Sequence, residues 1–110
     1  MNERPGMVIQ EGIIYIGSND KKLHAINGAD GRELWTYNTR GVVGLPTYHE
    51  GLILFGSSDQ YIHVLDARTG QLNWRVRISS PVKSQSLVHN GMVYAPTEDG
   101  SIYTVRIPSA

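Results

Sequence analysis

The chain has 110 residues, of which 40% are hydrophobic and 18% charged, and it contains no cysteine. Ten basic and ten acidic residues give a formal net charge of zero, which excludes the strong positive field typical of nucleic-acid-binding domains. Without cysteine there are no disulfides, no thiolate catalysis and no zinc sites built on cysteine. The length and composition are those of one folded domain over residues 1–110.

No targeting or membrane-spanning segment is visible in the sequence. Met1–Gly6 contains no apolar run, and no segment approaches the roughly 18 apolar residues of a membrane span. We therefore expect a soluble chain without a signal peptide, cytoplasmic by default. It would be periplasmic or extracellular if a signal had been removed from a longer precursor.

One sequence pattern occurs three times along the chain. The segments that begin at Gly12, Gly51 and Gly91 each contain a glycine, a short apolar run and an aspartate, and they are spaced by 39 and 40 residues. Trp35 and Trp74 repeat at the same spacing of 39. A period of about 40 residues with several short strands is typical of a β-propeller blade. A blade cannot bury its own faces, so neighbouring blades must stack.

Each unit is predicted to form four short strands joined by tight turns, in an all-β fold. The second strand of each unit is continuously apolar, as expected where both faces of a sheet are covered. The units span about 5–38, 39–78 and 79–108 and give two complete blades and a third without its outer strand, 11 strands in all. In chain order the predicted strands are Met7–Gln10, Ile13–Gly17, Leu23–Asn27, Glu33–Asn38, Leu45–His49, Leu52–Gly56, Ile62–Asp66, Leu72–Ile78, Ser84–His89, Met92–Ala95 and Ile102–Arg106.

The turns have recognisable chemistry. Asp99-Gly100 predicts a two-residue type I′ hairpin, which needs positive φ at both central residues. The equivalent pairs Asp20-Lys21 and Asp59-Gln60 lack the glycine. In these pairs, positive φ at a residue other than glycine should cost about 1 kcal/mol of stability, or the turn should use a longer loop. Asp66 is expected to accept backbone N–H bonds while Gly70 adopts a left-handed conformation.

Together these strands and turns resemble the pyrroloquinoline-quinone-type (PQQ-type) β-propeller repeat over nearly the whole chain. The resemblance is strongest at Leu65–Trp74, which reads LDARTGQLNW, and Gly12–Ser18 also fits closely. It implies that the tryptophans pack between blades while the glycines and aspartates shape turns. The residues with such structural roles are Gly12, Gly17, Asp20, Gly31, Trp35, Gly51, Gly56, Asp59, Asp66, Gly70, Trp74, Gly91, Asp99 and Gly100.

The resemblance implies little chemistry. Many members of this family bind no quinone and serve as assembly scaffolds, sensor domains or parts of larger enzymes. The quinone-dependent dehydrogenases add eight blades, a catalytic aspartate, calcium ligands and often a vicinal cysteine pair. This chain is too short to enclose such a site and has no cysteine. We therefore assign it no catalytic, cofactor-binding or metal-binding residue and expect no cofactor.

The histidines are interpreted as structural. His24 and His63 are repeat-equivalent, as are His49 and His89. Equivalent positions in adjacent blades should lie about 10 Å apart, too far to share a zinc ion, whose bonds to nitrogen are about 2 Å. No Ser–His–Asp order, phosphate-binding glycine loop or HExxH helix occurs either.

Arg75 and Arg77 alternate with apolar residues on the predicted outer strand of the second blade. A nucleic-acid stripe would need more cations and a basic balance. We interpret the two arginines as protection of a sheet edge against pairing with another strand.

The topology separates two rims. The loops at 39–44 and 79–83 should lie on the same rim as the aspartate turns, and the turns at 49–50 and 89–90 on the opposite rim. Propellers commonly bind at one rim or in the central channel. The possible partner face comprises Arg40, Lys83, Lys21, Gln60 and Glu98. The alternative is that each of these residues is only a solvated polar residue of the rim.

Propellers close with about four to eight blades. The chain is therefore expected to be a fragment, an open stack or part of an oligomeric ring, with a homodimer favoured. The predicted function is a non-catalytic interaction scaffold that binds a protein partner. The alternatives are a fragment of a quinone-dependent dehydrogenase or another propeller enzyme, and a small-ligand sensor domain.

Overall fold

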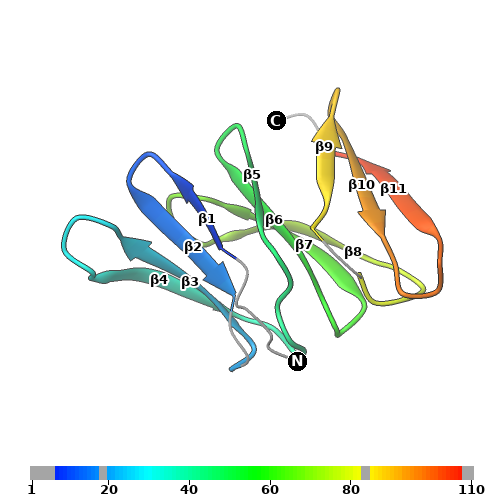
Figure 1. Cartoon of the computed structure of the whole chain (residues 1–110), viewed down its shortest axis with the longest axis horizontal. Coiled ribbons are helices and arrows are strands. Elements are labelled where there is room, and N and C mark those ends of the chain that lie inside the picture. The colour runs from blue at the N-terminus through cyan, green and yellow to red at the C-terminus, as the bar shows by residue number, and fades with distance from the viewer. Residues whose placement is uncertain (1–6, 18–19, 83–84, 108–110) are drawn as a thin grey trace.

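The structure is a computed structural model of the chain and describes residues 7–17, 20–82 and 85–107. These residues form eleven β-strands and no helix, in three antiparallel sheets that stand side by side (Figure 1). The all-β class and the eleven strands predicted from the sequence are confirmed. Blade 1 contains β1 (Met7–Gln10), β2 (Ile13–Gly17), β3 (Lys22–Asn27) and β4 (Glu33–Asn38). Blade 2 contains β5 (Thr47–His49), β6 (Leu52–Ser57), β7 (Tyr61–Asp66) and β8 (Leu72–Arg77). Blade 3 contains β9 (Leu87–His89), β10 (Met92–Pro96) and β11 (Ile102–Arg106).

Two strands begin later than the sequence predicted. β5 begins at Thr47 rather than Leu45, because Pro46 has no N–H for the ladder. β9 begins at Leu87, and the predicted start at Ser84 lies outside the described residues. The first strand of blade 2 and that of blade 3 are therefore only three residues long.

The type I′ turns lie between the first and second strands of each blade. Both residues of Glu11-Gly12, Glu50-Gly51 and Asn90-Gly91 have positive φ, between 48° and 84°. Two positive φ values in a two-residue hairpin match the right-handed twist of the flanking strands. The prediction that placed this turn type at Asp99-Gly100 is wrong, because only the second residue of that pair has positive φ.

The turns between the second and third strands of blades 2 and 3 are three-residue loops instead. Gln60 N–H donates to Ser57 O at 3.2 Å and Gly100 N–H to Thr97 O at 3.1 Å. The last loop residue is left-handed, with φ of 70° at Gln60, 91° at Gly100 and 68° at Lys21. Blades 2 and 3 therefore have a type I turn followed by a bulge residue, which is the longer form that the sequence left open for Asp59-Gln60.

Aspartates hold these loops through Asx-type hydrogen bonds. Asp20, Asp59 and Asp99 each accept the backbone N–H two residues further on, at 3.1, 3.1 and 3.0 Å. In the turn between β7 and β8, Asp66 accepts the N–H of the residue two positions on at 2.8 Å, and Gly70 has φ of +77°. These hydrogen bonds and the positive φ of Gly70 support the turn-forming roles predicted for these residues.

Blade 1 packs on blade 2 through an indole that lies on a glycine. Trp35 Nε1 donates to Ala67 O at 3.1 Å, and Tyr15 donates its hydroxyl to the same carbonyl at 3.1 Å. A Cβ atom on Gly70 would lie only 2.5 Å from the Trp35 ring. Trp35 remains half-buried, because this contact covers only part of the indole.

Blade 2 has the densest core because a blade covers each of its faces. Ile53, Phe55 and Leu65 are fully buried and belong to the cluster shared with blade 1. Leu54 and Val64 are fully buried in the cluster shared with blade 3, where the half-buried Trp74 also packs. The continuous apolar run of β6 therefore has the cause that was predicted from the sequence.

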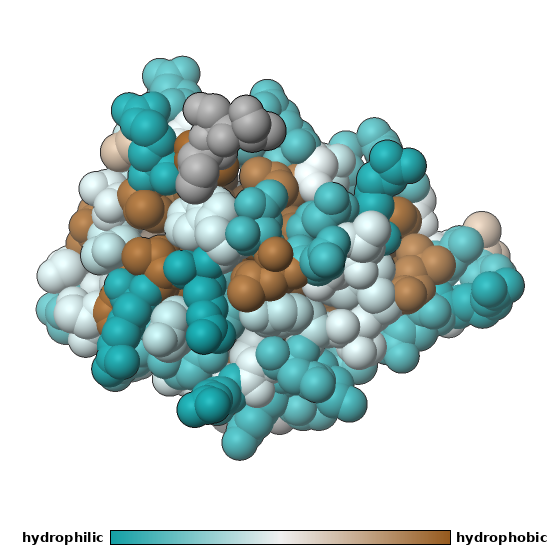
Figure 2. Space-filling model, turned by 180° about the vertical axis from the view of Figure 1, so that it is seen from behind, coloured by the Kyte–Doolittle hydropathy of each residue, from teal (hydrophilic) through white to brown (hydrophobic). Residues whose placement is uncertain are grey.

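The molecular surface seen from behind is mostly polar, with apolar side chains in separate patches (Figure 2). No helix long and apolar enough to cross a membrane occurs in the described part of the chain.

Gly70 and Gly31 provide a matched test of the seam between blades 1 and 2. Both have φ of +77°, but a Cβ on Gly31 would meet nothing within 4 Å. We expect Gly31→Ala to lower the free energy of unfolding by about 1 kcal/mol, the backbone cost alone. Gly70→Ala should cost about 1–3 kcal/mol more because the methyl group overlaps the indole.

Urea denaturation of both variants measures the difference, and adding Trp35→Ala to Gly70→Ala should remove the extra cost. Equal destabilisation by Gly31→Ala and Gly70→Ala would contradict the packing of the indole on Gly70.

Candidate functional site

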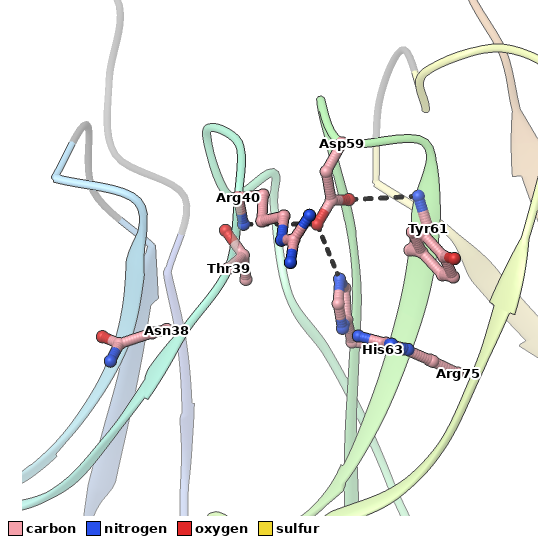
Figure 3. Close-up of a pocket in the computed structure, with 7 residues that line it drawn as sticks. All are labelled: Asn38, Thr39, Arg40, Asp59, Tyr61, His63 and Arg75. Atoms are coloured by element: carbon pink, nitrogen blue, oxygen red, sulfur yellow. Dashed lines mark hydrogen bonds and ion pairs between the residues drawn. The ribbon is translucent and has the colours of Figure 1, made fainter.

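A cavity of about 380 Å³ opens at the seam between blades 1 and 2 (Figure 3). Its walls come from the end of β4, from the link that leads into blade 2, and from β7, β8 and the turn before β7. The lining residues are Asn38, Thr39, Arg40, Asp59, Tyr61, His63 and Arg75.

The link between the blades is clamped onto the turn of blade 2. Arg40 N–H donates to Asp59 Oδ2 at 3.4 Å, and Val42 N–H donates to Ser58 Oγ at 2.8 Å. In return, Ser58 N–H donates to Val42 O at 3.0 Å. These bonds place the first residues of the link directly over the turn that carries Asp59.

Asp59 is almost fully engaged by its neighbours. Its carboxylate accepts hydrogen bonds from the Ser57 hydroxyl, from Tyr61 N–H at 3.1 Å and from Arg40 N–H, and it lies 3.3 Å from His63 Nε2. Burial acts to raise the pKa of this carboxyl, but the hydrogen bond from Ser57 and the charge of His63 outweigh it and hold the pKa below its usual value.

His63 is buried within an aromatic cluster. Its ring stacks on Phe55 with centroids 5.1 Å apart and meets the edge of Tyr37 at 5.4 Å. Its Nδ1 lies 3.2 Å from the Tyr37 hydroxyl. Burial lowers the pKa of His63 below 6.5 against the opposing effect of Asp59, so the imidazole is neutral at neutral pH.

Ser57, Asp59 and His63 meet in space without forming a catalytic triad. Ser57 Oγ lies 3.4 Å from His63 Nε2, and Asp59 approaches the same nitrogen. In a triad the carboxylate orients one ring nitrogen while the other activates the nucleophile. Ser57 is also only 3% exposed. The group therefore braces the turn and is not arranged for acyl transfer.

The sequence alone did not indicate that these three side chains converge. Ser57, Asp59 and His63 are separated by two and four residues across a three-residue hairpin loop. Had that loop length been recognised, the spacing would have indicated that their side chains converge, since flanking positions pair across the strands.

The equivalent histidine of blade 1 has the opposite character. His24 contacts Glu33 at 2.5 Å and Asp20 at 3.1 Å, and its side chain is 21% exposed against 2% for His63. The hydrogen bond to Glu33 raises the pKa of His24 above 6.5, against the effect of partial burial and with help from Asp20. Leu72 stands where Glu33 stands in blade 1, so blade 2 lacks this carboxylate.

Two guanidinium groups line the cavity. Arg75 lies over the ring of Tyr61, with its Cζ 4.7 Å from the ring centroid. Within residues 7–17, 20–82 and 85–107, neither Arg40 nor Arg75 forms an ion pair with a carboxylate. The edge protection expected of Arg75 stays a prediction: β8 is the outermost strand of its sheet, and Arg75 also lines the cavity.

Several residues of the possible partner face lie on one rim of the structure. Lys21 O accepts Thr39 N–H at 2.9 Å and Gln60 O accepts Ile78 N–H at 2.9 Å, which sets both turns against the links on one rim. Glu98 occupies the corresponding turn of blade 3. Of the predicted rim residues Arg40 alone lines the cavity, and Lys83 lies outside the described residues.

His49 ends β5 and His89 ends β9, each just before a separate turn, and the side chain of His49 is near Glu50 at 3.6 Å. In the described parts of the chain, no group of three or more histidine or carboxylate side chains is close enough together to hold a metal ion.

The pKa values of the two repeat-equivalent histidines, His24 and His63, should be shifted in opposite directions from 6.5. His63 binds a proton more weakly in the folded state than in the unfolded state, so it lowers stability as pH falls through 6.5. His24 binds a proton more tightly when folded, so its stabilisation is present below 6.5 and is lost as pH rises through its folded pKa.

Between about pH 8 and pH 5, His63→Phe should therefore lose less stability on acidification than the parent, and His24→Gln should lose more. Urea midpoints at the two pH values measure this, and nuclear magnetic resonance titration of the imidazole protons identifies each group. A higher pKa at His63 than at His24 would refute the assignment.

Comparison with known proteins gives a family and a fold. The family model PQQ_2, described as outer membrane protein assembly factor BamB, matches residues 2–109. No curated protein matches the chain.

Solved structures of propeller proteins are similar to this chain. The computationally designed Ika4 protein has 20% identity and a TM-score of 0.83, and the match covers 93% of this chain and 64% of that one. BamB from Moraxella catarrhalis has 23% identity and a TM-score of 0.81, with coverage of 92% and 32%. The quinohemoprotein alcohol dehydrogenase ADHIIG from Pseudomonas putida HK5 has 21% identity and a TM-score of 0.75, with coverage of 83% and 16%.

The chain thus spans less than two thirds of each of these three structures, and at such identities the likeness concerns the fold alone. The family match over almost the whole chain agrees with the repeated antiparallel sheets of the fold. The chain belongs to the PQQ-type β-propeller family whose model is described as outer membrane protein assembly factor BamB.

Proposed function

We propose that the chain is a non-catalytic β-propeller interaction module that associates with proteins through its uncovered blade faces and one rim. The supporting observation is that both end faces repeat the chemistry of the buried seams. A fold shared by BamB and by dehydrogenases is compatible with either role. The buried Ser57 and the misaligned imidazole of His63 favour the non-catalytic one.

The outer face of blade 3 carries residues that are buried at equivalent positions of blade 2. Ile102 is 65% exposed, whereas its counterpart Ile62 is fully buried against blade 3. Tyr94 stands at the position of Leu54, which is fully buried in the same seam. Leu87 adds a further apolar side chain that is 63% exposed.

The outer face of blade 1 carries apolar residues at the positions that, in blade 2, pack against blade 1. Ile16 and Ile26 stand where blade 2 has Phe55 and Leu65, which are fully buried against blade 1. Both isoleucines are only partly covered in blade 1. Soluble monomers rarely leave contiguous apolar surface of this kind exposed.

A second copy of the chain is the occupant we propose for these faces. The face of blade 3 would pack on the face of blade 1 of the other copy, and the reverse contact would close a ring. Two copies supply about six blades, within the usual range of four to eight.

The partner face is assigned to the rim that carries Arg40, Lys21, Gln60 and Glu98. These residues extend over the turns and links of all three blades, and their backbones are held by the hydrogen bonds described above. A rigid rim with exposed polar side chains can bind a partner with little ordering cost.

Assembly is tested by light scattering at micromolar concentration. The parent should have twice the chain mass of 12.2 kDa, and Ile102→Arg should give a folded monomer because it buries a charge in the proposed contact. Leu72→Arg is the control, since Leu72 is exposed at 40% and its equivalent in blade 1 is already charged.

A parent of 12.2 kDa that stays soluble and monomeric would exclude the ring. Equal loss of assembly in both variants would place the contact elsewhere.

The non-catalytic assignment has its own test. Titration with pyrroloquinoline quinone, followed by absorbance with and without calcium, should show no stoichiometric complex and no turnover of alcohols. The cavity lies in the seam between two blades, and a bound quinone needs an enclosed site with fixed polar partners. Micromolar quinone binding that calcium strengthens would favour the dehydrogenase reading instead.

A further inference from the structure

The two arginines of the cavity depart from the repeat. Ser79 stands at the position of Arg40 one blade later, and Thr36 stands at the position of Arg75 one blade earlier. A repeat copies the residues that its architecture needs. Since the equivalent turn and strand form without a guanidinium group, folding does not explain either arginine.

The two arginines are the cations of the cavity, and neither has an ion-pair partner among the described residues. The Asp59 carboxylate already has the four partners described above. Both ring nitrogens of His63 face Tyr37, Ser57 or Asp59. Arg75 rests on the Tyr61 ring, which orients its planar fork. In the part of the chain that the structure describes, two cations without carboxylate partners therefore face one concave space (Figure 3).

The cavity is also placed away from the axis of the blades. The first strands β1, β5 and β9 contact one another across the blades, so they lie on the inner side of the stack. The cavity is lined instead from β4 and β8, the outermost strands of their blades, and from β7 beside β8. A ligand here would contact the seam and not a central channel.

We propose that this cavity binds a small organic oxyanion, with its carboxylate or phosphate group held between Arg40 and Arg75. Guanidinium groups bind both oxyanions through paired, charge-assisted hydrogen bonds. The volume of about 380 Å³ lies at the lower end of the range for small-ligand sites. Because the walls come from two blades, a bound anion would also bridge the link at Arg40 and the outer strand at Arg75.

Calorimetric titration of the full chain tests the proposal, with glutarate and inorganic phosphate as probes and glutaramide as the uncharged control. We expect one saturable site for at least one anion and no binding of glutaramide. Arg40→Gln and Arg75→Gln should each weaken binding by roughly tenfold or more, the usual effect of losing a charged hydrogen-bond partner. Arg68→Gln removes the same charge from an exposed turn on the opposite rim and should bind as the parent does.

Amide spectra of every variant confirm that it is folded, and in the parent they should show ligand-induced shifts at Tyr61 and His63. A blocked tetraglutamate peptide distinguishes the source of the anion: tighter binding than glutarate indicates a protein side chain, and weaker binding indicates a free small molecule. The proposal is overturned if neither anion saturates, or if Arg68→Gln weakens binding as much as the two cavity variants. Because these titrations do not depend on assembly, the ring proposed above can fail while this site stands.

Discussion

The contact of one blade with the next is the constraint on which the rest of the molecule depends. A four-stranded sheet cannot bury two apolar faces by itself, and in this chain the indole of Trp35 joins blade 1 to the turn of blade 2. Its Nε1 bond to Ala67 O and its close approach to Gly70 set the distance between the sheets. That spacing lets Phe55 and His63 be buried, and it brings the link at Arg40 over the turn at Asp59.

Position in the stack, more than residue type, decides the chemistry of each side chain. His24 and His63 occupy the same place in consecutive repeats, yet the hydrogen bond with Glu33 raises the pKa of His24 while burial beneath blade 1 lowers the pKa of His63. The same logic makes Ile62 a core residue and leaves its counterpart Ile102 at the surface. If a further blade covered the end faces, the environments of His24 and Ile102 would approach those of their buried equivalents.

The sequence was sufficient for most of the fold because the repeat records it three times. The strand positions, the aspartate turns and the left-handed Gly70 follow from the period and from local turn chemistry, and the structure agrees with them. The errors of the predictions made from the sequence were local, at Asp99-Gly100 and at the start of β5. There the outcome depends on loop length and on the missing N–H of Pro46, neither of which an averaged repeat pattern represents.

The sequence by itself determined the blade, since period, apolar strands and turn residues are local properties of the chain. It did not determine the cavity, because Arg40 and Arg75 are far apart in the sequence and meet only when two blades stack. It placed Arg75 on a sheet edge, where β8 lies, but alternation along one strand does not show that this side chain also lines a cavity. Only the tertiary structure decided which repeat-equivalent groups are buried, which charges lack a partner and which residues share the seam, because burial and proximity are properties of the packed sheets.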